Sequence, residues 1–271
     1  MHLHPCFETA GALDAAAGNL SRAATRLALR EPHAVLMLAA TDGRDPFEGL
    51  RQNHSEMDAT VGGGWRLSRG PEPVCLLAER DDRRIHLVAG RQVVTRERLE
   101  VLALGTREQI PIHASLEETV EATEQRGALP VLPWGVGKWT GARGRLVREF
   151  LAAGGSERVV LADNGGRLAR WPTPDLLRPG PESRPPRAAG SDPFPFPGEE
   201  ARIAGYGTCL FADLDPERPA ASVLEALADP AVDRRIFGSL QGLPRFLASQ
   251  LRMQFRKLGG SGASRRENAL P

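Results

Sequence analysis

The run HAVLMLAA, residues 33–40, is short and almost wholly apolar. Such a run is typical of a strand buried on both faces, as strands of parallel sheets are. Before it, residues 13–30 repeat apolar side chains about every 3.6 residues, which predicts an amphipathic helix with Leu13, Leu20 and Leu27 on one face. Together with a strand at the start of the chain, these segments predict one β-α-β unit.

The alternation of strand and helix resumes in the second half of the chain. Helices are predicted over residues 115–127 and 142–155, and each is followed by a predicted strand, at 128–134 and 158–164. A further strand is predicted within residues 186–192. Strands that feed helices in this order favour a parallel sheet.

A run of short strands without helices separates these two regions. Apolar segments divided by polar turns predict a β-meander over 65–68, 74–79, 85–94 and 99–105. A weaker helix is predicted over residues 46–57. At the other end of the chain, residues 222–228 and 238–257 have helical spacing, and we expect them to form a closing helical layer.

The composition predicts an ordinary globular protein. Of the 271 residues, 41% are hydrophobic and 25% charged, and no apolar run approaches the roughly 20 residues of a membrane span. The net charge of +1 gives no reason to expect nucleic acid or a membrane as an obligate partner. Three widely spaced cysteines, without a CxxC pair, predict neither disulfides nor a zinc knuckle. We expect a cytoplasmic protein with one domain over residues 1–257 and a disordered tail over 258–271.

The order of the elements favours a closed barrel over an open doubly wound sheet. The chain offers about seven or eight strand-to-helix steps and has no GxGxxG nucleotide-binding turn. The predicted fold is therefore α/β: a distorted (β/α)7 TIM-like barrel with a β-meander insertion and a C-terminal helical layer.

In such a barrel the chemistry lies where the strands end at their carboxyl side. The polar residues after the apolar runs are therefore the candidates, although any surface loop also carries polar residues. Asp163 is one alternative carboxylate, but the Asp-Asn-Gly-Gly sequence around it is also common in turns. The candidates are His2 and His4; Thr41, Asp42 and Arg44; Arg91 and Gln92; Trp134, Gly135 and Lys138; Asp163 and Asn164; and Ser191 and Asp192.

The opening residues MHLHPCF place His2 and His4 one residue apart. On a strand, residues i and i+2 project from the same face, so these two imidazoles can converge on one ion. The spacing permits metal binding without identifying the metal. Only Met1 precedes the pair, and we therefore expect the natural chain to begin upstream.

This histidine pair, read together with the stretch AAGSDPF, resembles the PHP (polymerase and histidinol phosphatase) superfamily. The stretches LAATDGR, AGRQVVTRERLEVLALG and LPVLPWG are similar to further motifs of that family, and the resemblance spans residues 1 to about 210. It implies a distorted seven-stranded β/α barrel of PHP type, up to three divalent metals and hydrolysis of phosphate esters.

The chain departs from the family pattern at five metal-ligand positions. These positions hold Gly43, Gln92, Leu102, Pro133, and either Pro193 or Phe194. By matching position the resemblance leaves His2, His4 and Asp192 as ligands, which suffice for one zinc, manganese or iron ion but not for three.

The predicted activity is hydrolysis of a small anionic substrate by a metal-bound water, with Asp192 as ligand or base. Lys138 would act in catalysis and substrate binding, and Arg44 and Arg91 would supply further positive charge, since guanidinium groups suit phosphate and carboxylate. The remaining substrate contacts are expected from Trp134, Gly135 and Asn164. The alternative is a non-catalytic PHP-like barrel that binds a metabolite or a protein partner. The sequence does not predict the oligomeric state.

Overall fold

The computed structural model describes residues 7–41, 44–53, 59–178, 185–249 and 251–252. The helices are α1 (Thr9–Arg26), α2 (Pro46–Asn53), α3 (Leu116–Glu124), α4 (Gly141–Ala152) and α5 (Pro219–Ala228). The strands are β1 (Ala34–Ala40), β2 (Ala59–Thr60), β3 (Arg66–Arg69), β4 (Cys75–Arg80), β5 (Arg83–Val94), β6 (Glu100–Leu104), β7 (Leu129–Trp134), β8 (Val160–Asp163), β9 (Arg187–Ala189), β10 (Tyr206–Leu210) and β11 (Arg234–Gly238). There are also three short 3-10 helices, η1 (Gly155–Glu157), η2 (Asp175–Leu177) and η3 (Glu199–Arg202).

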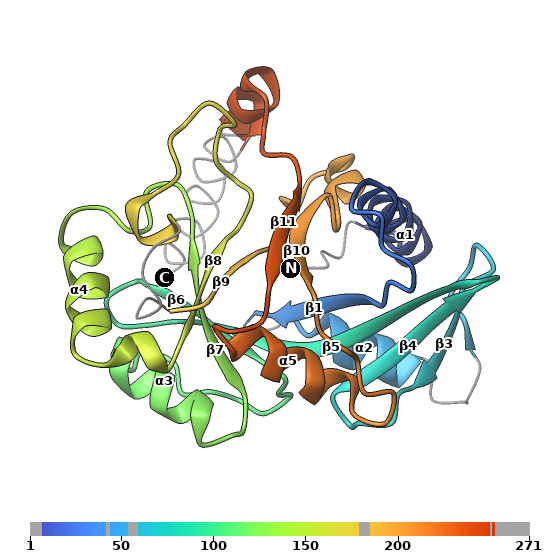
Figure 1. Cartoon of the computed structure of the whole chain (residues 1–271), viewed down its shortest axis with the longest axis horizontal. Helices are drawn as coiled ribbons and strands as arrows, with labels where there is room; N and C mark the ends of the chain where they lie inside the picture. The colour runs from blue at the N-terminus through green and yellow to red at the C-terminus, as the bar shows by residue number, and fades with distance from the viewer. Residues whose placement is uncertain (1–6, 42–43, 54–58, 179–184, 250, 253–271) are drawn as a thin grey trace, which may run out of the picture.

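Nine strands form one mixed sheet (Figure 1), in the order β2-β3-β4-β5-β6-β7-β8-β9, with β1 paired to β5. The strand β5 organises this sheet because it is twelve residues long and has three strand partners. The amide of Ala89 donates to the carbonyl of Val74, and the carbonyl of the same residue, Ala89, accepts from the amide of Gly105. The two groups of one residue point to the same side of a strand, so β4 and β6 lie end to end along one edge of β5 while β1 pairs in parallel along the other.

The predicted α/β class and the β-meander are confirmed, but a closed barrel is not. Strands β2 to β7 pair antiparallel with their neighbours, and the parallel pairs among the described strands are β1 with β5, β7 with β8 and β8 with β9. Hairpin connections of this kind replace the crossover helices that a regular β/α barrel needs. Among the described residues no pairing joins β1 to β9, and the strand expected at residues 1–6 lies outside them.

The sheet buries both of its faces. One face, which we call the α5 face, carries Met37, Leu102, Val131 and Ala162, and Leu224 of α5 packs among them. The opposite face packs against α1 and α2 at one end of the sheet and against α3 and α4 at the other (Figure 1). Because successive side chains of a strand point to opposite faces, the apolar residues of each face show to which face a polar side chain at a strand end belongs.

Of the two segments expected to form a closing helical layer, residues 222–228 lie in α5, which packs on the sheet, whereas the described part of 238–257 is helical only in part and largely exposed. Residues 243–249 and 251–252 are helical, and we call them the C-terminal helix. Leu243, Leu247 and Leu251 are more than half exposed, at 54%, 51% and 59%. Phe246 and Ser249 are the buried residues in the described part of this helix, and the Phe246 ring meets that of Trp171 edge-on, with 5.1 Å between centroids.

The short antiparallel pair β10 and β11 was not predicted from the sequence. It lies beside β9, joined by the bridge between Gly190 and Gly207 and by the Thr208 hydroxyl, which accepts from the Ala189 amide at 2.7 Å. The pair therefore covers the end of the sheet where Asp192 lies. None of the helices in the described ranges combines the length and apolarity needed to cross a bilayer.

Candidate functional site

Five strand ends meet along one edge of the sheet. Because β6 is antiparallel to both β5 and β7, the strands β1, β5, β7, β8 and β9 all run in the same direction. Their carboxyl ends therefore share an edge, which we call the carboxyl edge. The antiparallel β6 contributes its beginning, Glu100, to the same edge.

Side chains at this edge divide between the two faces of the sheet. Glu100 lies two residues before Leu102, and Asn164 lies two residues after Ala162, so both lie on the α5 face. The Asn164 amide nitrogen donates to the Asp192 carboxylate, with 3.4 Å between Nδ2 and Oδ2. Asp192 therefore lies beside Asn164 at the carboxyl edge, on the α5 face.

Gly135 allows Lys138 and Asn164 to approach each other. A β-carbon at Gly135 would lie 2.9 Å from Cδ of Lys138, closer than real β-carbons come, and 3.2 Å from Nδ2 of Asn164, which is a tight contact. Both side chains thus lie around one point above Gly135. The amide of Lys138 also donates to the carbonyl of Gly135 at 3.0 Å, which closes the turn that brings the lysine back over the strand end.

The Lys138 ammonium forms an ion pair with the Glu100 carboxylate. Their side chains are 26% and 20% exposed, so the pair is partly shielded from water. Asp192, Asn164, Gly135, Lys138 and Glu100 form what we call the mouth cluster. With two carboxylates and one ammonium, its formal charge is −1.

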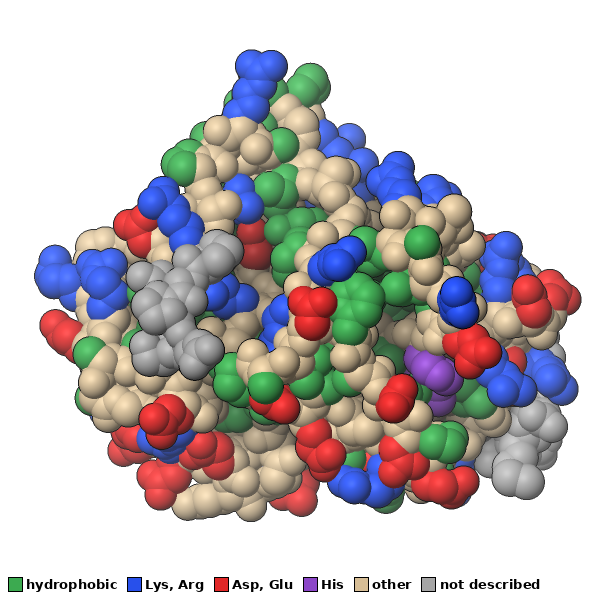
Figure 2. Space-filling model, in the orientation of Figure 1, with side chains coloured by type: hydrophobic (Ala, Val, Ile, Leu, Met, Phe, Trp, Pro, Cys, Tyr) green, Lys and Arg blue, Asp and Glu red, His purple; other side chains and the backbone are tan. Residues whose placement is uncertain are grey.

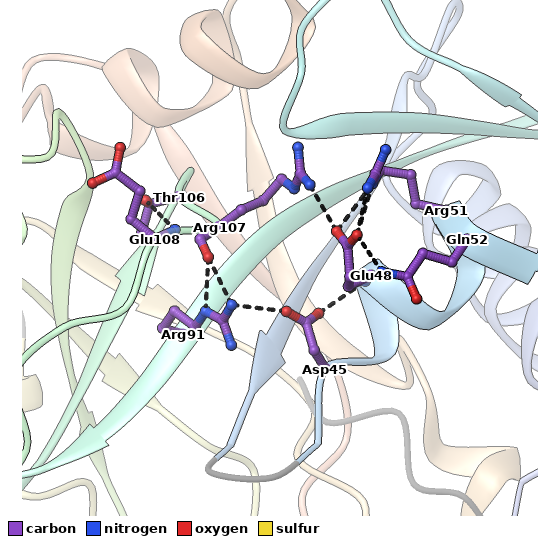
Figure 3. A network of polar contacts seen from close by, with 8 residues as sticks. All are labelled: Asp45, Glu48, Arg51, Gln52, Arg91, Thr106, Arg107 and Glu108. Atoms are coloured by element: carbon purple, nitrogen blue, oxygen red, sulfur yellow. Dashed lines mark hydrogen bonds and ion pairs between the residues drawn. The ribbon is translucent and has the colours of Figure 1, made fainter. Parts of the chain in front are cut away.

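The structure places Arg44, Arg91 and Trp134 away from the mouth cluster. Trp134 packs with the apolar side chains under α3 and α4, on the opposite face. Arg44 is exposed, and its backbone pairs with that of Thr41. The Arg91 guanidinium contacts the Asp45 carboxylate at 2.9 Å and donates to the carbonyl of Arg107, again on the opposite face (Figure 3).

Arg91 belongs to a network that joins α2 to the sheet (Figure 3). At its centre the Glu48 carboxylate accepts hydrogen bonds from Arg51, from Gln52 at 2.8 Å and from Arg107 at 2.8 Å. The Arg51 hydrogen bonds, with further help from Gln52 and Arg107, lower the pKa of Glu48 to about 2. Each carboxylate of this network has a guanidinium partner, so we assign the network a structural role.

Asp163, the alternative carboxylate, lies in a buried ion pair. Its Oδ2 contacts Nε of Arg167 at 2.7 Å, and their side chains are 7% and 8% exposed. Its Oδ1 accepts from the amide of Gly165 at 2.9 Å, and the Tyr206 hydroxyl donates to Oδ2 at 3.3 Å. Burial, and then the nearby Asp163 charge, raise the pKa of Tyr206 to about 12. These contacts satisfy Asp163 on the side away from the mouth cluster.

Of the three predicted metal ligands, only Asp192 is described. His2 and His4 lie outside the described residues, as do Asp42 and Gly43. Within the described ranges there is no group of three or more His, Cys, Asp or Glu side chains that could hold an ion. The described residues thus include one of the three predicted ligands.

Glu100 is the member of the mouth cluster that the sequence analysis missed. The candidate residues were those that follow a predicted strand, whereas Glu100 begins one. The polar turn before LEVLALG indicates a strand antiparallel to its neighbour, so the first residue of that run is also a candidate for the edge.

Comparisons of the chain with protein-family models, with curated proteins and with solved structures find no match.

Proposed function

We propose that this chain is a metal-dependent hydrolase of a small anionic substrate, with one divalent zinc, manganese or iron ion held by His2, His4 and Asp192. The PHP resemblance suggests the chemistry. The observation that supports it is the mouth cluster, where Asp192 and Lys138 lie around the same strand ends on one face of the sheet.

The charge of the mouth cluster favours a cation as its first ligand. With a formal charge of −1, the cluster repels an anionic substrate and attracts a divalent ion. Binding a divalent ion would change the local charge to +1, which then attracts the substrate. The proposal therefore requires the metal to bind before the anion.

The described residues fit this ion in part. The Asp192 carboxylate suits all three metals, and the Asn164 amide holds one of its oxygens. A bound divalent ion lowers the pKa of its water toward neutrality. Lys138, held in place by Glu100, would bind the negative charge of the substrate.

The PHP-type barrel forms part of this proposal. The parallel strands β1 and β9 each have one strand partner in the main sheet among the described residues, β5 and β8 respectively. In the proposed barrel a further strand would join β1 to β9, and it would have to displace β10, whose Thr208 hydroxyl accepts from the Ala189 amide at the outer edge of β9. The stretch expected to supply that strand is residues 1–6, which carries the histidine pair.

Turnover of p-nitrophenyl phosphate with added Zn²⁺, Mn²⁺ or Fe²⁺ tests the proposal. We expect metal-stimulated hydrolysis by the wild-type chain, a loss of at least about a hundredfold in Asp192→Asn, and a smaller loss in Lys138→Met. Asp175→Asn is the matched control, because that carboxylate is 87% exposed in a surface ion pair. Equal rates in Asp192→Asn and Asp175→Asn would contradict the assignment.

The second candidate function is non-catalytic binding of a metabolite or a protein partner by a PHP-like chain. One observation favours it: Glu100 already balances the Lys138 charge. A wild-type chain that takes up none of the three metals and hydrolyses none of a panel of phosphomonoesters, phosphodiesters and lactones would support this function over hydrolysis.

A further inference from the structure

A cavity of about 280 Å³ lies outside the mouth cluster, between the loop that follows β9 and the C-terminal helix. The loop contributes Gly198 and Glu199, and the helix contributes Arg245, Ser249 and Arg252. The cavity is open to solvent, and its volume is well above the roughly 10–15 Å³ that a single water needs.

Glu199 does not cancel the positive charge of this cavity. Its side chain is 6% exposed, and its Oε2 contacts Nη1 of Arg202 at 3.2 Å. Arg202 also donates to the carbonyl of Gly165 at 3.0 Å, which fixes it beside the glutamate. Arg245 contacts the other carboxylate oxygen through both Nε and Nη2, each at 3.5 Å, the outer limit of a hydrogen bond. Arg202 is therefore the principal partner of Glu199.

Arg252 brings a second cation to the cavity. Its guanidinium carbon lies 6.0 Å from the centre of the Phe196 ring. In the ranges that the structure describes, no carboxylate forms an ion pair with it. Glu200 accepts from the Gly198 amide at 2.7 Å, so the charges around the cavity are two carboxylates and three guanidinium groups, a net of +1.

The helix presents these groups along one side. Arg245 and Arg252 are seven residues apart, which is about two helical turns, and both line the cavity. Between them Ser249, with 3% of its surface exposed, lines the same wall. Basic side chains also stand along the upper rim of the molecule in Figure 2.

From this arrangement we propose that the cavity binds the phosphoryl group of a small phosphorylated molecule, with Arg245 and Arg252 as its principal ligands. Guanidinium forks bind tetrahedral phosphates through paired hydrogen bonds. A phosphoryl group has enough oxygens to accept from both forks and from a hydroxyl at once, whereas a carboxylate has two. Binding at this cavity needs no metal, and it is therefore independent of the proposed hydrolase site.

Calorimetric titration with inorganic phosphate, at constant ionic strength and with EDTA present, tests this proposal. Arg252→Gln is the decisive variant, because it removes a cation whose described contact is one aromatic ring. We expect its Kd to rise at least about tenfold, since a charged hydrogen bond contributes about 1.5 kcal/mol or more. Arg148→Gln, on the exposed surface of α4, should change the Kd less than about twofold.

Arg245→Gln should weaken phosphate binding as well, with circular dichroism as the check on its fold, because it also loses a contact to Glu199. The proposal is overturned if wild type gives no saturable binding, if Arg252→Gln binds phosphate as wild type does, or if Arg148→Gln loses as much affinity. Equal binding of acetate would overturn the selectivity for a phosphoryl group.

Discussion

Glu48 shows how one residue fastens a helix to the sheet (Figure 3). Its carboxylate is 23% exposed and accepts from Arg51 and Gln52 in its own helix and from Arg107 on the loop after β6. The low pKa of about 2 follows from the Arg51 hydrogen bonds, which outweigh the opposing effect of burial. The charged form of Glu48 therefore stabilises the folded state.

This pKa predicts a stability change in acid. Because folding lowers the pKa of Glu48 from 4.5 to about 2, its stabilising contribution is complete above pH 4.5 and is lost as the pH falls toward 2. We expect Glu48→Gln to have a lower free energy of unfolding than wild type at pH 6, and the difference to shrink toward zero near pH 2. Urea denaturation at a series of pH values measures it.

The exposed Glu217 provides the control for this experiment. Glu217→Gln should follow the wild-type profile at every pH. A constant difference between Glu48→Gln and wild type down to pH 2 would show that the ionised carboxylate has no special role.

The residue scale is also where the sequence predicts least. Arg91 and Gln92 are neighbours after the same apolar run, yet they lie on opposite faces of β5. A shift of one residue in register exchanges the two faces, and the apolar run around them is hydrophobic on both. The sequence therefore predicted that Arg91 lies near the carboxyl edge, but it could not predict the face.

At the scale of elements, α3 begins at a capping box. The amide of Glu118 donates to the Ser115 hydroxyl at 3.2 Å, and the Ser115 amide donates to the Glu118 carboxylate at 2.7 Å. These reciprocal bonds satisfy two of the amides that a helix start leaves without partners. The side chains that α3 buries, including Leu116 and Val120, pack against the opposite face of the sheet.

Removing this cap should destabilise the fold measurably. We expect Ser115→Ala to lower the free energy of unfolding by about 1 kcal/mol. Thr140, which precedes α4, is a suitable comparison because its side chain makes no capping bond. Thermal or urea denaturation should give a smaller loss for Thr140→Ala, and the reverse order would refute the capping argument.

Elements with strong patterns were predictable, and those with weak patterns were not. The helix α3 lies within its predicted range, and β7 and β8 coincide with apolar runs of the sequence. The strands β10 and β11 are five residues each, and neither is a continuous apolar run that would predict a buried strand. Their pairing is long-range, so no local signal specified it.

At the scale of the whole molecule, the buried pair of Asp163 and Arg167 joins three parts of the chain. Tyr206 reaches it from β10, and Arg167 donates to the carbonyl of Trp171. The backbone of Arg167 also accepts from Gln241, just before the C-terminal helix. This ion pair therefore ties the end of β8 to both later segments.

Breaking one side of this pair should be costly. Arg167→Met would leave the buried Asp163 carboxylate without its cation, and we expect it to lower the free energy of unfolding by about 3–5 kcal/mol. The double variant with Asp163→Asn should lose less than Arg167→Met alone. Arg178→Met, whose ion pair is exposed, should change stability by less than about 1 kcal/mol. An equal loss of unfolding free energy in Arg167→Met and in Arg178→Met would contradict the stabilising role of the buried pair.

Whether Asp192 helps to hold a metal is tested most directly by equilibrium dialysis against Zn²⁺, Mn²⁺ and Fe²⁺, with the bound metal counted by mass spectrometry. The proposed site predicts about one tightly bound ion per wild-type chain and in Asp175→Asn. It predicts an affinity at least about a hundredfold weaker in Asp192→Asn and in His4→Ala. Uptake of one ion by Asp192→Asn with wild-type affinity would contradict the proposed site.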